Sequence, residues 1–282
     1  MAQIFDPSRL DAVVARHHEV MRLGARQRQI IFGGACLGFL LFVFGLVEAD
    51  FSLSRILNGI GKLGDFAVLM FPPEPGPLFA TYLHALGETL AIALLGTLIA
   101  ATFAFPFAVL ASRNVLPFWV TRFVLRRSFD TIRGVDTLIW ALIWISVVGL
   151  GPFAGVLAVA TADFAAFGKL FSETIETADP KPVEGIRSTG GTAAQEFRFG
   201  ILPQILPVIA GQILYYFESN TRSATIIGIV GAGGIGLHLS EQIRTLEWQR
   251  VAFLVLMVLV VVAVIDFISS RLRTAISGAK PI

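Results

Sequence analysis

The chain has 282 residues, of which 55% are hydrophobic and 15% are charged, and its formal net charge is +2. Because ordinary soluble domains carry about 25% charged residues, this composition argues against a soluble protein. Several apolar runs of about 18 residues, long enough to cross a bilayer, favour a polytopic membrane protein. The single cysteine, Cys36, provides neither a disulfide framework nor a metal cluster, and no metal site is expected.

We expect an all-α fold with about six transmembrane helices. The first apolar run, Ile30 to Val47, could be a secretory signal, but it starts late, is long for one and lacks a small-x-small cleavage site. We therefore interpret it as a retained span. The six predicted spans cover residues 30–47, 86–111, 135–150, 153–170, 204–230 and 251–268.

Lysine and arginine residues divide unequally between the two sides that six spans create. One side receives seventeen of them, in the two termini, a loop over 112–134 and a segment over 169–203. The other side receives four, and Arg222 lies within a span. Because cytoplasmic loops retain positive charge, both termini are predicted to be cytoplasmic.

A polar segment over residues 171–207 interrupts the apolar runs on the predicted cytoplasmic side. Pro180 and Pro182 are expected to end one helix, and Val183 to Thr189 to form another. Such a segment is either a docking element for a cytosolic partner or simply a loop.

The second half of this segment carries turn and capping signals. Gly190-Gly191 breaks the helix, and Thr192 with Gln195 forms a capping box for a third short helix ending near Phe199. Together these helices predict a compact knob on the inner face.

The fifth span contains a polar run of six residues, and charged residues at membrane depth are candidates for lining a pathway. The run comprises Glu218, Ser219, Asn220, Thr221, Arg222 and Ser223. It is poor in helix formers, and broken helices are tolerated where they line a cavity. Arg222 could bind an oxyanion through its planar fork, with hydroxyl and amide donors beside it. Alternatively, Glu218 and Arg222 form a salt bridge that holds the span together; the two interpretations are compatible.

Asp163 is a second acid within a predicted span. It could line the pathway or pair with Arg222, whereas a buried, protonated acid would be inert. We favour the polar role.

The stretch from Gly228 to Gly236 matches the dinucleotide spacing G-x-G-x-x-G. That fingerprint requires an acidic residue about 20 positions further on, and no acid occurs from Val251 to Ile265. We therefore exclude a dinucleotide site and expect a gate or a packing interface at the outer end of the fifth span. The glycines concerned are Gly231, Gly233, Gly234 and Gly236.

The knob resembles the E-A-A-x3-G-x9-I-x-L-P coupling motif of importer-type ABC permeases. Gly185, Ile186 and Gly200 depart from it, where Ala, Ala and Ile are usual, while the glutamate, the glycine and the Leu-Pro pair keep their distances. In that family this segment inserts into a groove of the ATPase subunit. The resemblance therefore implies that the ATPase-coupling residues are Glu184, Gly185, Ile186, Arg187, Gly190, Leu202 and Pro203.

Longer phrases, among them GLGPFAGVLA, YYFESNTRSATIIGIVGAGGIG and IDFISSRLR, resemble the permease of binding-protein-dependent phosphonate importers. The likeness covers about residues 80 to 275. It implies a subunit of the bacterial inner membrane that forms a homodimer and transports phosphonates or related small oxyanions. Its partners would be ABC ATPase subunits and a periplasmic or extracellular substrate-binding protein, with no nucleic acid.

No G-x-x-x-x-G-K-[ST] motif occurs in the chain, so ATP and Mg would be used by a separate ATPase and this chain would bind no cofactor. An ion-driven secondary transporter of a small anion is the alternative, with Asp163, Glu218 and Arg222 as a proton relay. It would require internal repeats, and none is found. An intramembrane enzyme would need supporting motif residues, which are also missing.

We divide the chain into four parts. Residues 1–28 form a cytoplasmic segment that is either a basic amphipathic helix over 8–24 on the membrane face or a solvated flank. Residues 29–80 contain the first span and an irregular external loop, 81–275 the permease core, and 276–282 a cytoplasmic tail.

Overall fold

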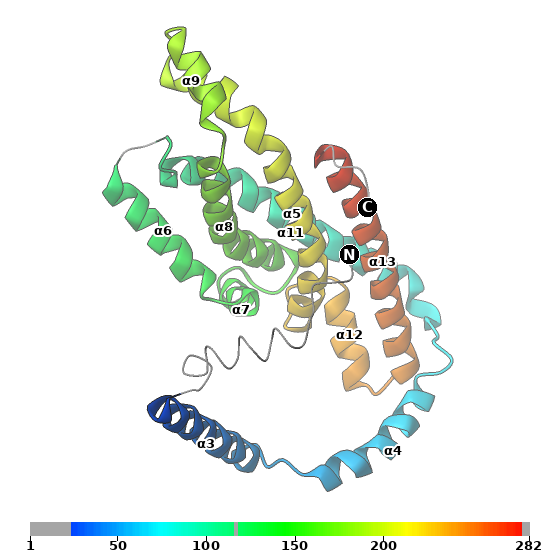
Figure 1. The fold of residues 1–282 in the computed structure, drawn as a ribbon. Coiled ribbons are helices and arrows are strands. Elements are labelled where there is room, and N and C mark those ends of the chain that lie inside the picture. Colours follow the sequence, from blue (N-terminus) through cyan, green and yellow to red (C-terminus); the bar gives the residue numbers. More distant parts are fainter. Residues whose placement is uncertain (1–23, 116–117, 278–282) are drawn as a thin grey trace, which may run out of the picture. The chain divides into compact units, whose positions relative to one another are not determined.

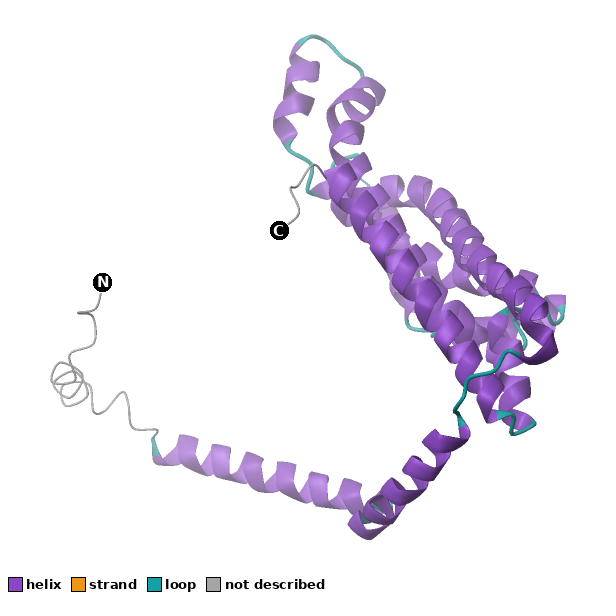
Figure 2. Cartoon of the chain, turned by 90° about the vertical axis from the view of Figure 1, so that its right-hand side faces the viewer, coloured by secondary structure: helices purple, strands orange, loops and turns teal. Residues whose placement is uncertain are grey.

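The computed structural model describes residues 24–115 and 118–277. All regular elements in these ranges are helices, and none is a strand (Figure 2). The chain divides into two compact units, residues 1–66 and 67–282. The helix predicted over residues 8–24 lies outside the described ranges, apart from Gly24.

The first unit contains helix α3, Ala25–Glu48, and most of helix α4, Leu53–Leu69. Helix α3 is strongly apolar, and the most hydrophobic part of it buries no residue within the protein, as expected for a span that faces lipid. The loop after the first span was predicted to be irregular, which is wrong for Leu53–Leu69 because these residues form helix α4. Their apolar residues recur at helical spacing.

Four long helices form the frame of the second unit (Figure 1). They are α5, Phe79–Ala111; α8, Pro152–Glu176; α11, Leu202–Ile229; and α13, Trp248–Ser277. Small residues let α5 and α8 approach closely: a β-carbon at Gly96 would lie 2.6 Å from Cγ1 of Val159. Close packing through small residues is the usual way for helices to associate in membranes.

The predicted third span, 135–150, is only partly correct. Its helix, α7, covers Thr137–Val148, and 12 residues extend about 18 Å, too short to cross the bilayer core of about 30 Å. The predicted cytoplasmic loop over 112–134 instead contains helix α6, Trp119–Arg133. Helices α6 and α7 meet at an 87° bend. Apart from this pair, five helices among the described residues are long and apolar enough to span a membrane, and the pair would make a sixth if it forms one bent span.

The segment between α8 and α11 also differs from its prediction in detail. Helix α8 already ends at Glu176, and Pro180 begins helix α9, Pro180–Ser188, because proline suits the first helical turn. The next helix does not end near Phe199. Helix α10, Ala193–Gln195, continues through a π-helical turn, η2, Glu196–Ile201, into α11.

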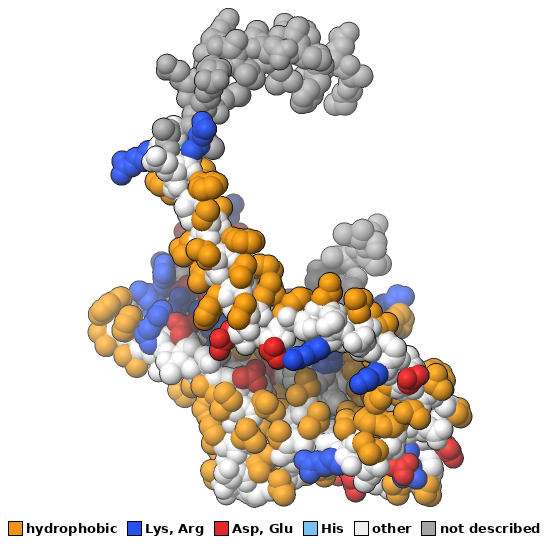
Figure 3. Space-filling model, turned by 90° about the horizontal axis from the view of Figure 1, so that it is seen from below, with side chains coloured by type: hydrophobic (Ala, Val, Ile, Leu, Met, Phe, Trp, Pro, Cys, Tyr) orange, Lys and Arg blue, Asp and Glu red, His pale blue; other side chains and the backbone are white. Residues whose placement is uncertain are grey.

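Helix α9 lies beyond one end of α11, and helix α12, Ile235–Arg244, lies at the other end (Figure 1). Hydrophobic side chains are spread widely over the face seen in Figure 3, with Lys, Arg, Asp and Glu in small groups between them. An apolar exterior is what lipid contact requires.

Candidate functional site

A closed polar cluster joins α5, α8 and α11. The side-chain amide of Asn220 donates hydrogen bonds to the carboxylate of Asp163 and to Oγ1 of Thr97, the latter at 2.8 Å. Thr97 Oγ1 in turn donates to the backbone oxygen of Ala93 at 2.7 Å. Asp163, Asn220 and Thr97 are all buried, so this cluster satisfies its polar groups internally. The predicted alternative partner of Asp163, Arg222, is not bonded to it.

An open ionic cluster lies on another face of α11. Glu218 accepts a hydrogen bond from Nη1 of Arg222 at 3.3 Å and another from Nη2 of Arg273 at 3.1 Å. The Glu218 side chain is 10% exposed, whereas the Arg222 side chain is 49% exposed. Glu218 and Arg222 therefore do pair, and half of the arginine stays accessible.

The remaining hydroxyl residues of the polar run lie within the regular helix α11. Thr221 donates its hydroxyl to the backbone oxygen of Phe217 at 3.0 Å, and Ser219 and Ser223 are half-buried. The expected break in the span does not occur, because α11 continues through all six residues.

The glycine turn between α11 and α12 packs closely against α5. Gly231, Gly233 and Gly234 have positive φ angles of 104°, 82° and 73°, which favour glycine. The backbone nitrogen of Ile235 donates to Oγ1 of Thr89 on α5 at 2.8 Å.

The glycines on either side of this turn lie against backbone atoms. A β-carbon at Gly228 would lie 2.6 Å from the backbone oxygen of Gly233, and one at Gly236 would overlap with the backbone oxygen of Thr225. These approaches favour the packing alternative for the glycine stretch; a gate stays a prediction.

The helical hairpin between α8 and α11 exposes the residues predicted to contact an ATPase. Glu184 and Gly185 are exposed on α9, and Ile186 is half-buried. Gly190 has a φ of 79°, so the chain reverses there in a conformation that favours glycine. Thr192 and Gln195 form the predicted capping box.

Arg187 has a partner inside the hairpin. Its Nε and Nη2 atoms donate to the two carboxylate oxygens of Glu196 at 3.0 and 2.9 Å. The pKa of Glu196 is lowered, first by this hydrogen bond, and that of Arg187 is raised by the same contact. This bidentate pair fixes α9 against η2, and Arg187 remains largely exposed.

The base of the hairpin, where α9 and η2 meet the start of α11, is closely packed and hydrogen-bonded. Gln204, on the first turn of α11, accepts from the backbone nitrogen of Asp179 at 2.9 Å and donates to the backbone oxygen of Gly200 at 2.6 Å. A β-carbon at Gly200 would lie 3.0 Å from Cγ2 of Val183, so the isoleucine usual at this position would crowd α9. Leu202 and Pro203 open α11 immediately after this joint.

A second joint, at the end of α8, was not predicted from the sequence. The Glu176 carboxylate accepts from the backbone nitrogen of Arg113 at 2.8 Å and from Nη2 of Arg126 at 2.7 Å. It thereby ties α8, just before the hairpin, to the end of α5 and to α6.

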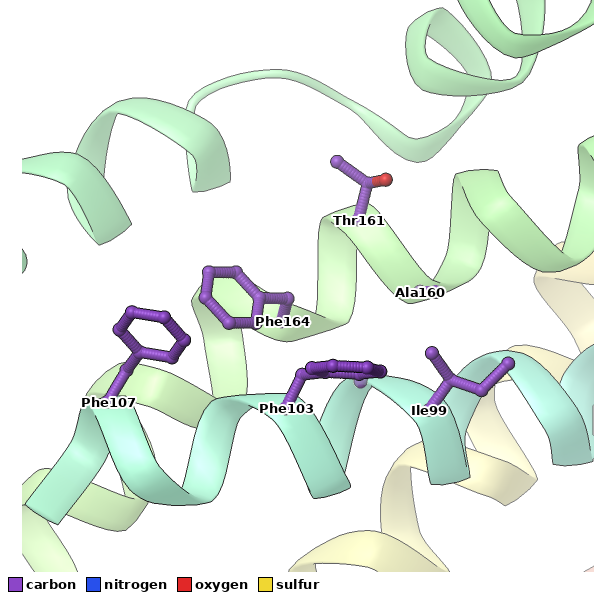
Figure 4. Close-up of a pocket in the computed structure, with 7 residues that line it drawn as sticks. Ile99, Phe103, Phe107, Ala160, Thr161 and Phe164 are labelled. Carbon is purple, nitrogen blue, oxygen red and sulfur yellow. The ribbon is translucent and has the colours of Figure 1, made fainter.

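No group of three or more His, Cys, Asp or Glu side chains that could hold a metal ion occurs in the described ranges. An apolar groove of about 350 Å³ lies between α5 and α8, and Ile99, Phe103, Phe107 and Phe164 line it (Figure 4). Its polar lining group, the Thr161 hydroxyl, already donates to the backbone oxygen of Leu157 at 2.7 Å. The groove is therefore unsuited to an anion.

Comparison with known proteins defines the class. Residues 104–278 match the family model described as binding-protein-dependent transport system inner membrane component. The chain is 37% identical over 255 residues to the putative phosphite transport system permease protein HtxC of Stutzerimonas stutzeri, covering 90% of this chain and 89% of that protein. It is also 34% identical over 272 residues to the phosphite transport system permease protein PtxC of the same organism, covering 92% and 98%.

The fold has solved relatives. The MetNI methionine ABC transporter in an inward-facing conformation contains a chain that matches with a TM-score of 0.62 and 18% identity, covering 72% of this chain and 99% of that one.

The family match and the fold together define a multi-pass inner-membrane subunit of the ABC permease class, whose regular elements in the described residues are all helices. The chain belongs to the family of binding-protein-dependent transport system inner membrane components. It is a transport subunit, as predicted.

Proposed function

We propose that this chain forms the membrane pathway of an ATP-driven importer for phosphonates or related small oxyanions. The observation that carries this proposal is Arg222, a half-exposed guanidinium within an apolar span. Relatives named as phosphite permeases, which match nine-tenths of the chain, support the substrate class.

Exposure of Arg222 argues for an aqueous surface. A charged side chain at membrane depth is costly against lipid, so this face of α11 lies against water or another protein chain. A guanidinium there attracts tetrahedral oxyanions through bidentate hydrogen bonds. The neighbouring residues Ser219 and Ser223 supply further hydroxyl donors.

The hairpin from α9 to η2 serves as the coupling element of a separate ATPase, which uses ATP and Mg. Glu184 contacts the ATPase, Gly190 provides the bend, and Pro203 begins the rigid connection to α11. Because α10, η2 and α11 form one continuous helical path, a displacement of α9 reaches the span that carries Arg222.

The complete transporter contains two copies of this chain, two ATPase chains and an external substrate-binding protein. Both termini lie in the cytoplasm, in accordance with the positive charge of the tails and of the α9 segment. The chain itself binds no cofactor.

Reconstitution in liposomes with the ATPase and the binding protein tests this function. We expect ATP-dependent uptake of labelled methylphosphonate, phosphite or phosphate that requires all three components. Uptake that ignores ATP and follows a proton gradient would instead favour a secondary transporter with Asp163, Glu218 and Arg222 as a relay.

A further inference from the structure

Helix α4, Leu53–Leu69, follows the first span directly and has an apolar face that no part of its own unit covers. Only residues 49–52 separate it from the end of α3. No residue of α4 is buried within the described part of the chain. Its large apolar residues recur every three or four positions, so they share one side of the helix. We call this side the apolar face; it comprises Leu53, Ile56, Leu57, Ile60 and Leu63, whose exposed fractions are 49–67%.

Both ends of α4 are connected to spans at the same membrane face. The helix has 17 residues, which extend about 25 Å, and it includes Arg55, Lys62 and Asp65. It is therefore too short and too polar to cross a hydrocarbon core of about 30 Å. The end of α3 and the start of α5 consequently lie on one side of the membrane, and α4 runs along that side.

The link after α4, residues 70–78, is attached to the permease frame at the end that carries α12. The backbone nitrogen of Glu74 donates to the backbone oxygen of Gln249, in the first turn of α13, at 3.4 Å. At this end of the frame, the backbone nitrogen of Ile235, which begins α12, donates to Thr89 of α5. This end is opposite to the α9 hairpin (Figure 1). The chain thus leaves α4 at the membrane face opposite to the hairpin.

The composition of α4 calls for a stabilising contact along its length. Gly59, Gly61 and Gly64 lie inside the helix, and glycine is unfavourable in a helix interior. A helix of this length is marginal in water without tertiary contacts. β-Carbons added at these three glycines would meet nothing within 4 Å, so no packing of the described residues supplies that contact. An apolar phase against the apolar face would supply it.

We propose that α4 lies in the membrane interface, with its apolar face inserted among lipid acyl chains. Its charges do not call for anionic lipid. Arg55 donates to Oδ2 of Asp50 at 2.7 Å, and Lys62 and Asp65 have opposite signs. Burial of apolar area therefore drives the contact, and lipid charge contributes little. This anchoring of α4 does not depend on the transported substrate.

Site-directed fluorescence tests the position of α4 in the full chain, reconstituted in phosphatidylcholine liposomes. In a Cys36→Ala background, which removes the native cysteine, one bimane label is attached at Ile60→Cys or at Asn58→Cys. The two positions lie about 200° apart around the helix, so exposed Asn58 is the matched control on the polar side. A nitroxide on the lipid acyl chain should quench the label at residue 60 about fivefold more than at residue 58, and aqueous iodide should do the reverse.

A second label at Leu57→Cys, also on the apolar face, should behave like the label at Ile60→Cys. Similar quenching by iodide at residues 58 and 60 would show that the apolar face lies in water, and α4 would then not be a membrane anchor. Exclusion of both quenchers from residue 60 would show that a protein surface covers this face, from a second copy or from the permease core. That result would equally overturn the lipid contact.

Lipid charge gives a further readout. Quenching at residue 60 should change by less than about twofold when phosphatidylglycerol is added to the liposomes or when salt is raised, because apolar burial is insensitive to both. Quenching by the lipid nitroxide that appears only with phosphatidylglycerol would show that charge, and not the apolar face, holds α4 to the membrane.

Discussion

Two polar clusters occupy different faces of α11, and they differ in almost every physical respect. Residues 218 and 222 are one helical turn apart, whereas Asn220 points about 200° away from Glu218. The Asn220 cluster is buried among α5, α8 and α11 and has a partner for each polar side chain. In the Glu218 cluster, one carboxylate accepts hydrogen bonds from two arginines, and half of the Arg222 side chain is exposed.

The difference shows that a polar run in a span need not have a single role. A closed cluster stabilises helix packing, since buried polar groups are expensive unless they are hydrogen-bonded. An exposed guanidinium such as that of Arg222 is accessible to a ligand. Substitutions in the closed cluster should therefore reduce stability, and those in the open cluster should reduce transport.

The largest effect is expected for Asn220→Leu. This change removes both hydrogen bonds of the amide and leaves the buried Asp163 carboxyl without a partner, at a cost of about 2 kcal/mol or more. Thermal unfolding of the detergent-solubilised protein measures it. Ser219→Ala, on the adjacent half-buried position, is the control and should change the midpoint little. An unchanged midpoint for Asn220→Leu would show that the closed cluster does not stabilise the fold.

Gly228→Ala tests the outer end of α11. The new β-carbon would lie 2.6 Å from the backbone oxygen of Gly233, and overpacking of this kind costs about 1–3 kcal/mol. At Gly211 on the same helix, a β-carbon would meet nothing within 4 Å, so Gly211→Ala should be neutral or slightly stabilising. Equal melting temperatures for the two variants would contradict a packed junction.

Arg222→Ala and Glu184→Lys separate transport from docking. Loss of the accessible guanidinium should reduce uptake about tenfold, while the ATPase still co-purifies with the permease. Glu184→Lys should loosen the ATPase, because it reverses the charge of an exposed position on α9. Equal loss of the ATPase in both variants would indicate folding defects rather than separate roles.

The smallest effect concerns the pair of exposed Arg187 and half-buried Glu196 in the hairpin, which serves as a reference for the Glu218–Arg222 pair in α11. The lowered pKa of Glu196 means that the folded hairpin binds this proton less readily than the unfolded chain does. Its stabilisation is therefore present above the ordinary pKa of 4.5 and is lost as the pH falls through the lower folded value.

Hydrogen exchange of the hairpin amides across this pH range measures the effect. Glu196→Gln should show reduced protection at neutral pH and no further change on acidification. Identical pH profiles for the variant and wild type would show that the pair does not hold the hairpin.

Much of the hairpin between α8 and α11 could be predicted from local patterns. The Thr192 and Gln195 capping box and the glycine bend at Gly190 depend on residues close in the chain. The course of the chain into α11 could not be predicted, because the π-helical turn at Glu196–Ile201 depends on contacts with α9. Likewise, residues 112–134 were predicted to form a loop, although Trp119–Arg133 form helix α6, whose Arg126 pairs with Glu176.

The sequence by itself determined the class of this protein, the approximate number of its spans and the polar run in the fifth span. The number of spans and the polar run follow from composition, run length and local spacing, whereas the class follows from the resemblance of sequence motifs to those of importer-type ABC permeases. Only the tertiary structure decided which polar residues meet, since Asn220 lies 57 residues from Asp163 and Glu218 lies 55 residues from Arg273. Pairing over such distances is set by how helices pack side by side, and helical periodicity within one segment contains no information about its neighbour.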